Sequence, residues 1–409
     1  MKSYLERNPL LYPPEPSGDA GKAGHFAIIP VYDENAHIYS TLASVKTALI
    51  RSPEPVKVIL VLNEPANAPA GACQRNRELL ASLQKNDGKY DGGLSVGREL
   101  FFINLLDKEI KTKFRTVGNA RKCGFDGALH QIDGQVTDQN SLLFSLDADT
   151  LVSPDYFISA LQYFRLHPEL AGAVFDFEHR LSGIRELDLA AMRYEIYLRD
   201  YSCKLKNARS EYWFWTIGSA FACTARDYMR CGGMRRHAAG EDFYFLQALR
   251  KVGRIGVVPD CRVYPAGRVS DRVPFGTGPA IARQLQGEMP ELYNPDSFEL
   301  LKAFFLHCET LEYDQLTGAI TGAAETELQE FFQTLDFDCI WAKIVRNTPR
   351  CREKLLEALH IYCDGFFIIK FCHWLEQQYP GKFARQKMFS DELLAEKLHA
   401  LRQECALLA

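Results

Sequence analysis

The sequence predicts an α/β fold in which a mostly parallel central sheet is flanked by helices and followed by an all-helical C-terminal extension. Two observations carry this prediction. Between residues 25 and 177, short continuous apolar runs alternate with amphipathic stretches, which is typical of parallel strands buried on both faces and joined by helices. After about Pro279, apolar residues recur at helical spacing and strand patterns become scarce.

Each element is predicted by its local pattern, in chain order. Short continuous apolar runs predict buried strands at residues 26–31, 56–62, 99–105, 141–146 and 172–177. Apolar residues at helical spacing predict helices at residues 37–51, 74–85, 119–131 and 154–166. The same spacing predicts the C-terminal helices at residues 300–305, 328–337, 340–345, 355–372 and 393–408.

The pattern divides the chain into three expected parts. Residues 1–24 are rich in Pro and Gly and predict a flexible or loosely docked N-terminal arm. Residues 25–280 carry the alternating pattern and form the expected α/β domain, and residues 281–409 form the expected helical domain.

The composition excludes several classes of protein. Of 409 residues, 47% are apolar and 24% charged, which excludes a disordered or collagen-like chain. The net charge of -4 gives no general attraction to nucleic acid. Residues 212–225, the longest uncharged apolar run, are too short to cross a bilayer, and the first 24 residues lack the apolar core of a signal peptide. We expect a soluble cytoplasmic protein, and its 12 cysteines, without any C-x-x-C pair, predict buried free thiols rather than disulfides or a zinc site.

The sharpest chemical pattern is Asp147-Ala148-Asp149, directly after the strand expected at 141–146. Side chains two residues apart on an extended chain point to the same side, so both carboxylates can meet one ligand. In open α/β sheets, ligands bind at the carboxyl ends of strands, and Mg²⁺ or Mn²⁺ is held by one or two carboxylates together with waters and phosphates. The pattern predicts a divalent metal site, and a solvated acidic turn is the alternative.

A second acidic pair, Glu241-Asp242, follows Gly240 at the start of an expected helix. Carboxylates at this position interact favourably with the helix dipole, which is the plain structural explanation. A carboxylate held in a cleft can also accept a proton from an attacking hydroxyl group. On this motif alone both interpretations stay open.

Residues 262–278 form a segment rich in Gly and Pro that carries Arg262, Arg268 and Arg272. Guanidinium groups bind phosphate oxygens in pairs, and glycine lets the backbone approach a ligand. The segment therefore indicates an anion site, with a solvated loop held by surface ion pairs as the alternative. Gly118, Arg121 and Lys122, at the start of the third expected helix, make a comparable anion site.

Taken in order, these segments resemble the motifs of family 2 glycosyltransferases. Residues 29–35, Ile-Pro-Val-Tyr-Asp-Glu-Asn, are similar to the I-P-x-Y-N-E opening motif, and residues 117–124 are similar to the G-x-x-x-A-R-N-x-G segment. The D-A-D sequence stands where the family has its D-x-D metal motif. Residues 218–221, 232–234 and 240–242 match the acceptor-side segment and the E-D base motif. The resemblance covers roughly residues 26–278 and implies a GT-A fold, a nucleotide-diphosphate sugar donor and inversion at the anomeric carbon.

The resemblance implies roles for individual residues. Pro30, Tyr32 and Glu34 would line the nucleoside pocket, with Asn63 on the next strand able to hydrogen-bond the base, and Arg121 belongs to the second motif. Asp147 would face the donor ribose and the metal, and Asp149 would be the more direct metal ligand. Asp242 would be the general base, with Glu241 beside it. Arg268 and Arg272 would help the metal to neutralise the departing diphosphate, an inference from their charge.

The acceptor side is less defined. The resemblance places Gly218 and Ser219 there. His179 follows a strand and could contact an acceptor or be a structural histidine. Trp215 belongs to the aromatic run 212–215, which could stack on a sugar or form a core strand.

Departures from the family pattern refine the prediction. Asn63-Glu64-Pro65 replaces the D-D-G-S that commonly ends the second strand, which leaves the nucleotide open. The Q-x-x-R-W motif and membrane helices of processive synthases are missing from the sequence, which favours transfer of a single sugar. Tyr264-Pro265 stands where a histidine often supplies a further metal ligand.

We therefore expect a metal-dependent, inverting glycosyltransferase. Its acceptor would be a glycan, a lipid-linked sugar or a small molecule, and the chain would lie in the cytoplasm or at the inner face of the membrane, with a homo-oligomer among the alternatives. The main competing hypothesis is a catalytically silent GT-A scaffold that binds a nucleotide or a protein partner through its helical third. A sugar-1-phosphate nucleotidyltransferase would need a Gly-rich, Arg-bearing loop after the first strand, and a glycosidase would need carboxylates that flank a glycosidic bond.

Overall fold

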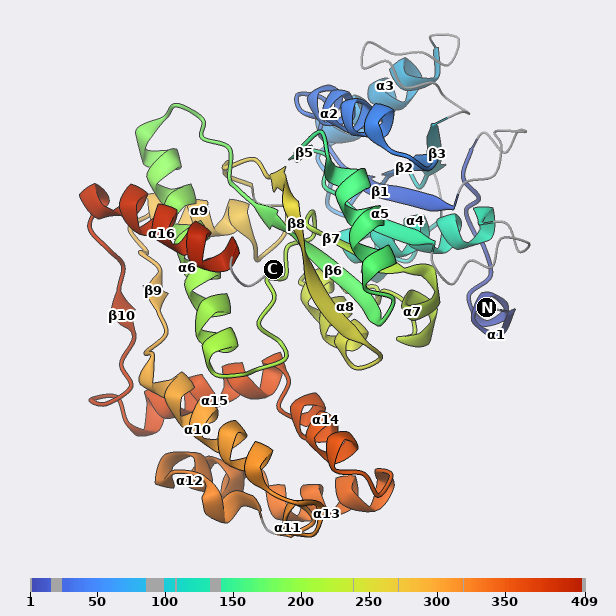
Figure 1. Ribbon diagram of the computed structural model, residues 1–409. Helices are drawn as coiled ribbons and strands as arrows, with labels where there is room; N and C mark the ends of the chain where they lie inside the picture. The colour runs from blue at the N-terminus through green and yellow to red at the C-terminus, as the bar shows by residue number, and fades with distance from the viewer. Residues whose placement is uncertain are drawn as a thin grey trace. The chain divides into compact units, whose positions relative to one another are not determined.

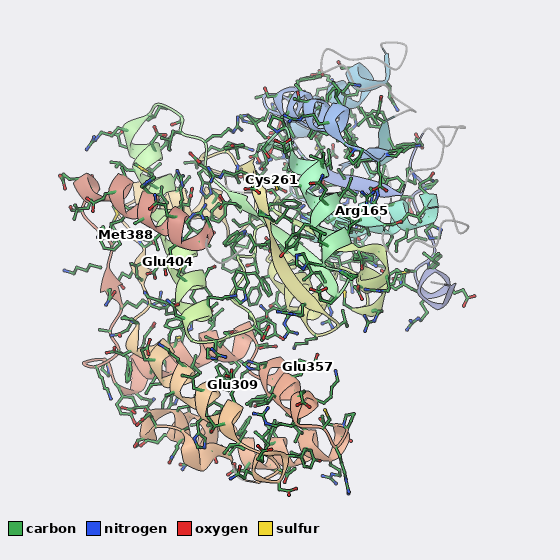
Figure 2. All side chains as sticks on the ribbon, in the orientation of Figure 1. Arg165, Cys261, Glu309, Glu357, Met388 and Glu404 are labelled. Carbon is green, nitrogen blue, oxygen red and sulfur yellow. The ribbon has the colours of Figure 1, made fainter. Side chains whose placement is uncertain are left out.

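The computed structural model describes residues 2–15, 24–85, 99–106, 109–132, 141–237, 239–270, 272–318 and 320–406. The chain forms two compact units. Unit 1 comprises Met1–Ala191 and Thr216–Leu285, and unit 2 comprises Met192–Trp215 and Gln286–Leu408. Side chains fill the space between the sheet and the helices of unit 1, and between the helices of unit 2 (Figure 2).

Unit 1 is built on a mixed, mostly parallel sheet (Figure 1). Among the described residues, its strand order is β3-β2-β1-β4-β7-β6-β8-β5. β1 runs parallel to β2 and β4, β2 to β3, and β6 to β8, whereas β7 is antiparallel to both its neighbours and β5 is antiparallel to β8. The strands are β1 (His25–Val31), β2 (Val56–Leu62), β3 (Leu100–Asn104), β4 (Leu142–Ser145), β5 (Leu151–Val152), β6 (Leu170–Phe177), β7 (Phe221–Thr224) and β8 (Arg254–Tyr264).

Helices cover this sheet and make its central strands buried along their whole length. Every residue of β1 and β2 is buried, as continuous apolar runs require. The helices of unit 1 are α1 (Lys2–Arg7), α2 (Ile38–Arg51), α3 (Ala70–Lys85), α4 (Val117–Gln131), α5 (Tyr156–Leu166), α7 (Ala225–Arg230), α8 (Glu241–Arg250) and α9 (Thr277–Leu285), with a 3-10 turn η1 at Thr112–Phe114. α6 (Arg185–Asn207) begins in unit 1 and continues into unit 2. The expected α/β fold with a mostly parallel sheet is confirmed.

Helix α4 packs unusually close to the sheet, and this closeness places its functional side chain. A Cβ atom at Gly124 would lie 2.4 Å from Ile28 Cγ2 and 3.0 Å from Val61 Cγ2. Only a residue without a side chain therefore lets α4 approach β1 and β2 to this distance. The adjacent turn of the same helix carries Arg121, which is 2% exposed.

The described part of the N-terminal arm is docked on unit 1. Tyr4 is buried, and its hydroxyl donates to Asp126 Oδ1 at 2.9 Å. Glu15 exchanges two backbone hydrogen bonds of 2.6 Å with Phe102 of β3. The expectation of a loosely held arm is therefore wrong for residues 2–15, whereas residues 16–23 lie outside the described residues.

Unit 2 is helical apart from a short ribbon. Its helices after α6 are α10 (Asp296–Thr310), α11 (Tyr313–Leu316), α12 (Thr326–Thr334), α13 (Phe337–Asn347), α14 (Arg352–Tyr362), α15 (Gly365–Gln378) and α16 (Leu394–Ala406), with 3-10 turns η3 (Ile320–Ala323) and η4 (Asp391–Leu393). β9 (Glu291–Leu292) and β10 (Gln386–Lys387) form an antiparallel ribbon, so the extension is not all-helical. The single helix expected at 355–372 is two helices, because Asp364 caps α15 by accepting from the amides of Phe366 and Phe367.

Three further observations bear on the expectations. The run 212–215 is not a strand: it is a buried segment of irregular structure in unit 2. The twelve cysteines are free, and seven are buried. In the part of the chain that the structure describes, no helix has the length and apolar character that a membrane span needs.

Candidate functional site

The candidate site lies at the carboxyl ends of the parallel strands β1, β2 and β4. Tyr32 to Glu34 follow β1, Asn63 follows β2, and Asp147 to Asp149 follow β4. Strands that run parallel bring the residues after them to one edge of the sheet. The structure thus brings the motif at residues 29–35 close to the D-A-D motif at residues 147–149. Residues from α4, α8 and the loop after β8 join them in two networks of charged groups.

The first network is centred on Arg121 of α4. Its guanidinium donates from Nε to Glu241 Oε1 at 2.9 Å, from Nη1 to Ser145 Oγ at 2.7 Å, and from Nη2 to Asp147 Oδ1. Ser145 Oγ in turn donates to the carbonyl of Gly218 at 2.6 Å. One buried guanidinium therefore ties together α8, the end of β4 and the Gly218 segment, residues that are far apart in the sequence.

Close backbone contacts hold this network in place. A Cβ atom at Gly118 would lie 2.5 Å from the carbonyl oxygen of His237, so the loop before α8 packs on the first turn of α4. A Cβ atom at Gly218 would lie 2.5 Å from Arg121 Nη2 and 3.4 Å from Asp242 Oδ2. Glycine is required at both positions because any side chain would displace a backbone or a guanidinium group.

Asp242 sits beside this network as a half-buried carboxylate. Its Oδ1 accepts from the amide of Phe243 at 2.8 Å. Burial, followed by the negative charge of Glu241, raises the pKa of Asp242 to about 7, although Arg121 acts in the opposite direction. Near neutral pH this carboxylate can therefore both lose and accept a proton, as a general base must.

The second network joins Glu34 and Asp149 through two arginines of the loop after β8. Arg268 donates from Nη2 to Glu34 Oε1 at 2.6 Å and to Asp149 Oδ2 at 2.7 Å. Arg272 donates from Nη1 to the carbonyl of Tyr32 at 2.8 Å and also to Glu34 Oε1. The two guanidinium groups lie 26–28% exposed between carboxylates that are 4% and 18% exposed.

Glu34 is the most buried member of this cluster. Among the described residues, its Oε2 atom has no hydrogen-bond partner. Burial, followed by the charge of Asp149, raises the pKa of Glu34 to about 7, while Arg272 and Arg268 lower it. The loop that carries Glu34 is fixed from behind, because the amide of Asp33 donates to Asn76 Oδ1 at 2.8 Å and Arg75 binds the Asp33 carboxylate.

Arg180, which the sequence analysis did not single out, also belongs to the second network. Its Nη2 donates to the backbone carbonyl of Asp149 at 2.6 Å. Its backbone amide donates to the carbonyl of Pro265, so the segment after β6 runs beside the segment after β8. In the sequence, Arg180 is marked only by its place after a strand next to His179, which does not reveal its contact with Asp149.

Arg262, grouped in the sequence with Arg268 and Arg272, lies elsewhere. It is part of β8, and its guanidinium binds Asp176 at 2.7 Å and Glu178 at 2.8 Å. The interpretation of 262–278 as one loop is therefore wrong for its first residues, because the apolar alternation around Val263 continues the strand.

The remaining predicted donor residues flank the second network. Pro30 is buried in β1 opposite Val61, and Tyr32 is half-buried directly after the strand. Asn63 is 8% exposed, and its carbonyl accepts from Asn76 Nδ2 at 3.3 Å.

The predicted acceptor-side residues are distributed over both units. Gly218 borders Arg121 and Asp242, and Ser219 is buried next to it. His179 is 3% exposed, with Nε2 3.1 Å from Thr277 Oγ1. Trp215 belongs to unit 2, where it is buried and Arg199 lies 5.8 Å from its ring centroid.

The residues present permit a divalent cation without forming a complete protein cage for it. Within the described ranges, no group of three or more His, Cys, Asp or Glu residues could hold a metal. Arg121 contacts Oδ1 of Asp147, and Arg268 contacts Oδ2 of Asp149, so each carboxylate keeps its other oxygen for a further ligand. Two carboxylate oxygens fit Mg²⁺ or Mn²⁺ when waters and substrate phosphates supply the other ligands.

Comparisons with known proteins place the fold among distant structural neighbours. Neither a family model nor a curated protein matches the chain in sequence. The structure is similar to that of S. aureus TarS 1–349 in complex with UDP-GlcNAc, with a TM-score of 0.42 and 12% identity over 79% of this chain and 90% of that one.

Two further solved structures, a mannosyltransferase and a synthase by name, are also similar to this chain. Mannosyltransferase PcManGT from Pyrobaculum calidifontis, in complex with GDP-Man and Mn²⁺, has a TM-score of 0.36 and 15% identity over 88% of this chain and 91% of that one. Glucosyl-3-phosphoglycerate synthase from Mycobacterium tuberculosis has a TM-score of 0.34 and 11% identity over 60% of this chain and 71% of that one.

Proposed function

We propose that the chain is a GT-A glycosyltransferase that moves a single sugar from a nucleotide-diphosphate donor to a hydroxyl group of an acceptor, with inversion at the anomeric carbon. The observation that carries the proposal is the convergence of the sequence motifs. Arg121 of the second motif contacts Asp147 of D-A-D and Glu241 of the E-D pair, 26 and 120 residues away in the sequence. These charged groups come together at the carboxyl edge of the sheet, which is where open α/β folds bind their ligands.

The donor diphosphate would bind to Arg268 and Arg272. In the structure both guanidinium groups are neutralised by Glu34 and Asp149. A diphosphate offers oxygen pairs that match the guanidinium fork, so it can replace these carboxylates as the partner of the arginines. We place the nucleoside beside Tyr32 and Asn63, where Pro30 closes the floor, and we place Glu34 at the border between nucleoside and diphosphate.

A divalent metal, Mn²⁺ or Mg²⁺, would be held by Asp149 and Asp147 together with the diphosphate. When bound, such an ion supplies positive charge that stabilises the departing diphosphate. Arg180 would keep Asp149 in position through its backbone carbonyl, at 2.6 Å. When the two arginines bind the phosphate oxygens instead, their positive charge no longer neutralises the Asp149 carboxylate. This carboxylate then attracts a cation more strongly.

Asp242 would act as the general base. Its free Oδ2 accepts the proton of the acceptor hydroxyl while that oxygen attacks the anomeric carbon and the bond from this carbon to the diphosphate oxygen breaks. Attack opposite to the leaving group inverts the configuration. Glu241, held by Arg121, would orient α8 and raise the basicity of its neighbour through its charge, so we assign it a positioning role beside the base.

The acceptor side and the wider assignments follow from the same proposal. We propose that Gly218 and Ser219 border the acceptor, with His179 as a further candidate from the same unit. Unit 1 would form the catalytic domain, which differs from the expected range 25–280 because residues 192–215 belong to unit 2. The acceptor class, a homo-oligomer and a location in the cytoplasm or at the inner face of the membrane stay predictions.

Release of nucleoside diphosphate from a panel of nucleotide sugars tests the proposal. Many transferases hydrolyse their donor slowly without an acceptor, so the panel needs no acceptor. We expect the wild type to turn over one donor with Mn²⁺. Turnover in Asp242→Asn should be at least 100-fold lower, since general-base catalysis contributes about 10²–10⁴-fold. Turnover in the exposed control Asp314→Asn should be unchanged. Binding of a nucleoside diphosphate without turnover of any sugar would favour the silent scaffold instead.

A further inference from the structure

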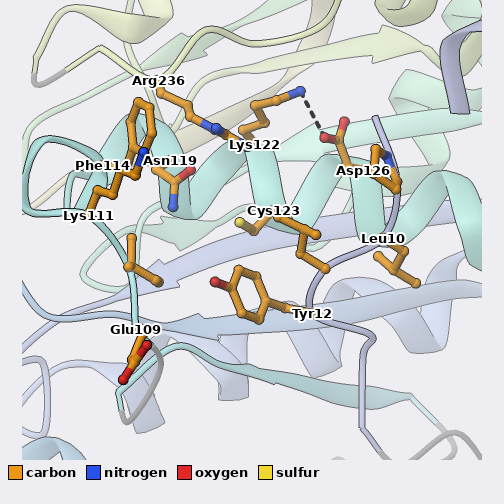
Figure 3. A pocket seen from close by; sticks show the side chains of 13 residues that line it. Leu10, Tyr12, Glu109, Lys111, Phe114, Asn119, Lys122, Cys123, Asp126 and Arg236 are labelled. Carbon is orange, nitrogen blue, oxygen red and sulfur yellow. Dashed lines mark ion pairs between the residues drawn. The ribbon is translucent and has the colours of Figure 1, made fainter. Parts of the chain in front are cut away.

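A cavity lies between helix α4 and the N-terminal arm (Figure 3), and none of the residues of the proposed donor site lines it. It measures about 210 Å³. Its floor is the helix face formed by Asn119, Lys122, Cys123 and Asp126. These positions repeat every three or four residues, so they share one face of the helix, and Arg121 points to the opposite face. The cavity is therefore separate from the Arg121 network although it shares the same helix.

The N-terminal arm forms the roof of this cavity and is fastened on both sides of it. On one side, the ring of Tyr4 is buried against Gly233. A Cβ atom at Gly233 would lie 2.0 Å from the Tyr4 hydroxyl oxygen, so the glycine makes room for this side chain of the arm. On the other side, Glu15 pairs with β3. The arm residues between these anchors, among them Leu10 and Tyr12, line the cavity. The roof is thus part of the folded unit.

Some of the charged side chains that line the cavity form ion pairs, and others do not. Lys122 and Asp126 neutralise each other at 2.8 Å, and Lys122 also donates to Asn8 Oδ1 at 3.1 Å. By contrast, Lys111 and Arg236 have no carboxylate partner among the residues that the structure describes. Figure 3 shows these two side chains at one end of the cavity and Glu109 at the other. One end of the cavity is therefore positive.

The wall beside these cations is apolar and aromatic. The guanidinium carbon of Arg236 lies 4.8 Å from the ring centroid of Phe114, a cation–π contact that holds the guanidinium at the rim of the cavity. Ile110 and Leu10 line the same space. Burial raises the pKa of Cys123 to about 11, so its thiol is neutral and adds to the apolar surface.

We propose that this cavity is a binding site for a small organic anion, an acid group attached to a planar apolar body. The acid group binds Lys111 and Arg236, and the apolar body packs between Phe114, Ile110 and the arm. The volume of about 210 Å³ lies below the range of about 300–1,000 Å³ found for pockets of drug-sized ligands, so the ligand is a small metabolite. The acid can be a phosphate monoester or a carboxylate, since both match the two cations. This site goes beyond the proposed sugar transfer and does not depend on it.

Calorimetric titration of the full chain with phenyl phosphate, benzoate and inorganic phosphate tests the proposal. We expect phenyl phosphate or benzoate to bind with a stoichiometry of one, and at least tenfold more weakly to the double variant Lys111→Met, Arg236→Met. Both side chains are exposed, so the variant should keep its fold, and its unfolding temperature is checked. Arg254→Met, at the exposed start of β8, is the matched control and should bind like the wild type.

Competition with UDP separates this site from the donor site. We expect binding of the probe to persist in saturating UDP and in Asp149→Asn. Probe binding that UDP abolishes would assign the anion to the donor site and overturn the proposal, as would equal binding by the double variant or no binding of any probe. A failure of every nucleoside diphosphate to bind, while the probe still binds, would contradict the proposed function and leave this site intact.

Discussion

Replacing Asp242 by asparagine should stabilise the protein at alkaline pH while removing its proposed activity. The carboxylate is half-buried next to Glu241, and the fold raises its pKa from 3.8 to about 7. A raised carboxyl pKa means that the folded state binds the proton more tightly than the unfolded state. This contribution to stability is therefore complete below about pH 4 and is lost as the pH rises through about 7. Above that pH, the folded protein bears the cost of an ionised Asp242.

The magnitude follows from the size of the rise. At about 1.4 kcal/mol per pKa unit, a change from 3.8 to about 7 corresponds to roughly 4 kcal/mol. We take about half of this, roughly 2 kcal/mol, because the side chain is partly solvated and interacts with Glu241. Asparagine keeps the acceptor for the amide of Phe243 but carries no charge, so it should recover this energy.

Thermal unfolding of Asp242→Asn and of wild type, at pH 5 and at pH 8, measures the effect. One kcal/mol shifts the midpoint of a unit of this size by about 2 °C, so we expect a gain of about 4 °C at pH 8 and of about 1.5 °C at pH 5, where about a third of the effect is present. In a rate assay, the wild type should gain activity as the pH rises through about 7, since the base must be unprotonated. A variant that is no more stable than wild type at pH 8 would refute the burial of an ionised carboxylate at this position.

Four further predictions address the two networks. Arg121→Met leaves Glu241 buried and unpaired, so the free energy of unfolding should fall by about 3–5 kcal/mol in denaturant titrations. Arg268→Met removes charge-assisted hydrogen bonds worth about 1.5–3 kcal/mol, so the Kd of a nucleoside diphosphate should rise at least tenfold in calorimetry, and an unchanged Kd would exclude the arginine from the donor site. Gly218→Ala places a methyl group 2.5 Å from Arg121 Nη2 and should lower kcat about 10–100-fold with the fold retained by circular dichroism. EDTA should abolish donor turnover and Mn²⁺ restore it, whereas full turnover in EDTA would contradict the proposed cation.

The central strands were predictable because burial on both faces leaves an unambiguous pattern. β1 and β2 appear in the sequence as continuous apolar runs, and the structure places them within a residue of the expected bounds. β7 and β8 were not predicted. β7 has only four residues, and Pro259 and Asp260 interrupt β8 where its register with β6 shifts and Asp260 takes a φ of 58°. Both strands depend on pairing with neighbours remote in the chain, which local periodicity does not reveal.

The sequence motifs predicted which residues belong to the site, but not which partners these residues bind. The sequence singled out Asp147, Asp149 and Arg268, and the structure places them at the same edge of the sheet. It did not indicate that Asp147 and Asp149 would bind different arginines, because ion-pair partners depend on which loops meet in space. Arg180 was missed for the same reason: its contact is with a backbone carbonyl 31 residues away, which no local pattern encodes.

The most direct test of the central claim is a calorimetric titration of wild type and Asp149→Asn with nucleoside diphosphates, with and without Mn²⁺. The proposed donor site predicts saturable binding of one nucleoside diphosphate to the wild type, tighter with Mn²⁺, and loss of the Mn²⁺ effect in the variant. Absence of binding for every nucleoside diphosphate, with the protein folded, would contradict the assignment of a nucleotide-sugar site to this edge of the sheet.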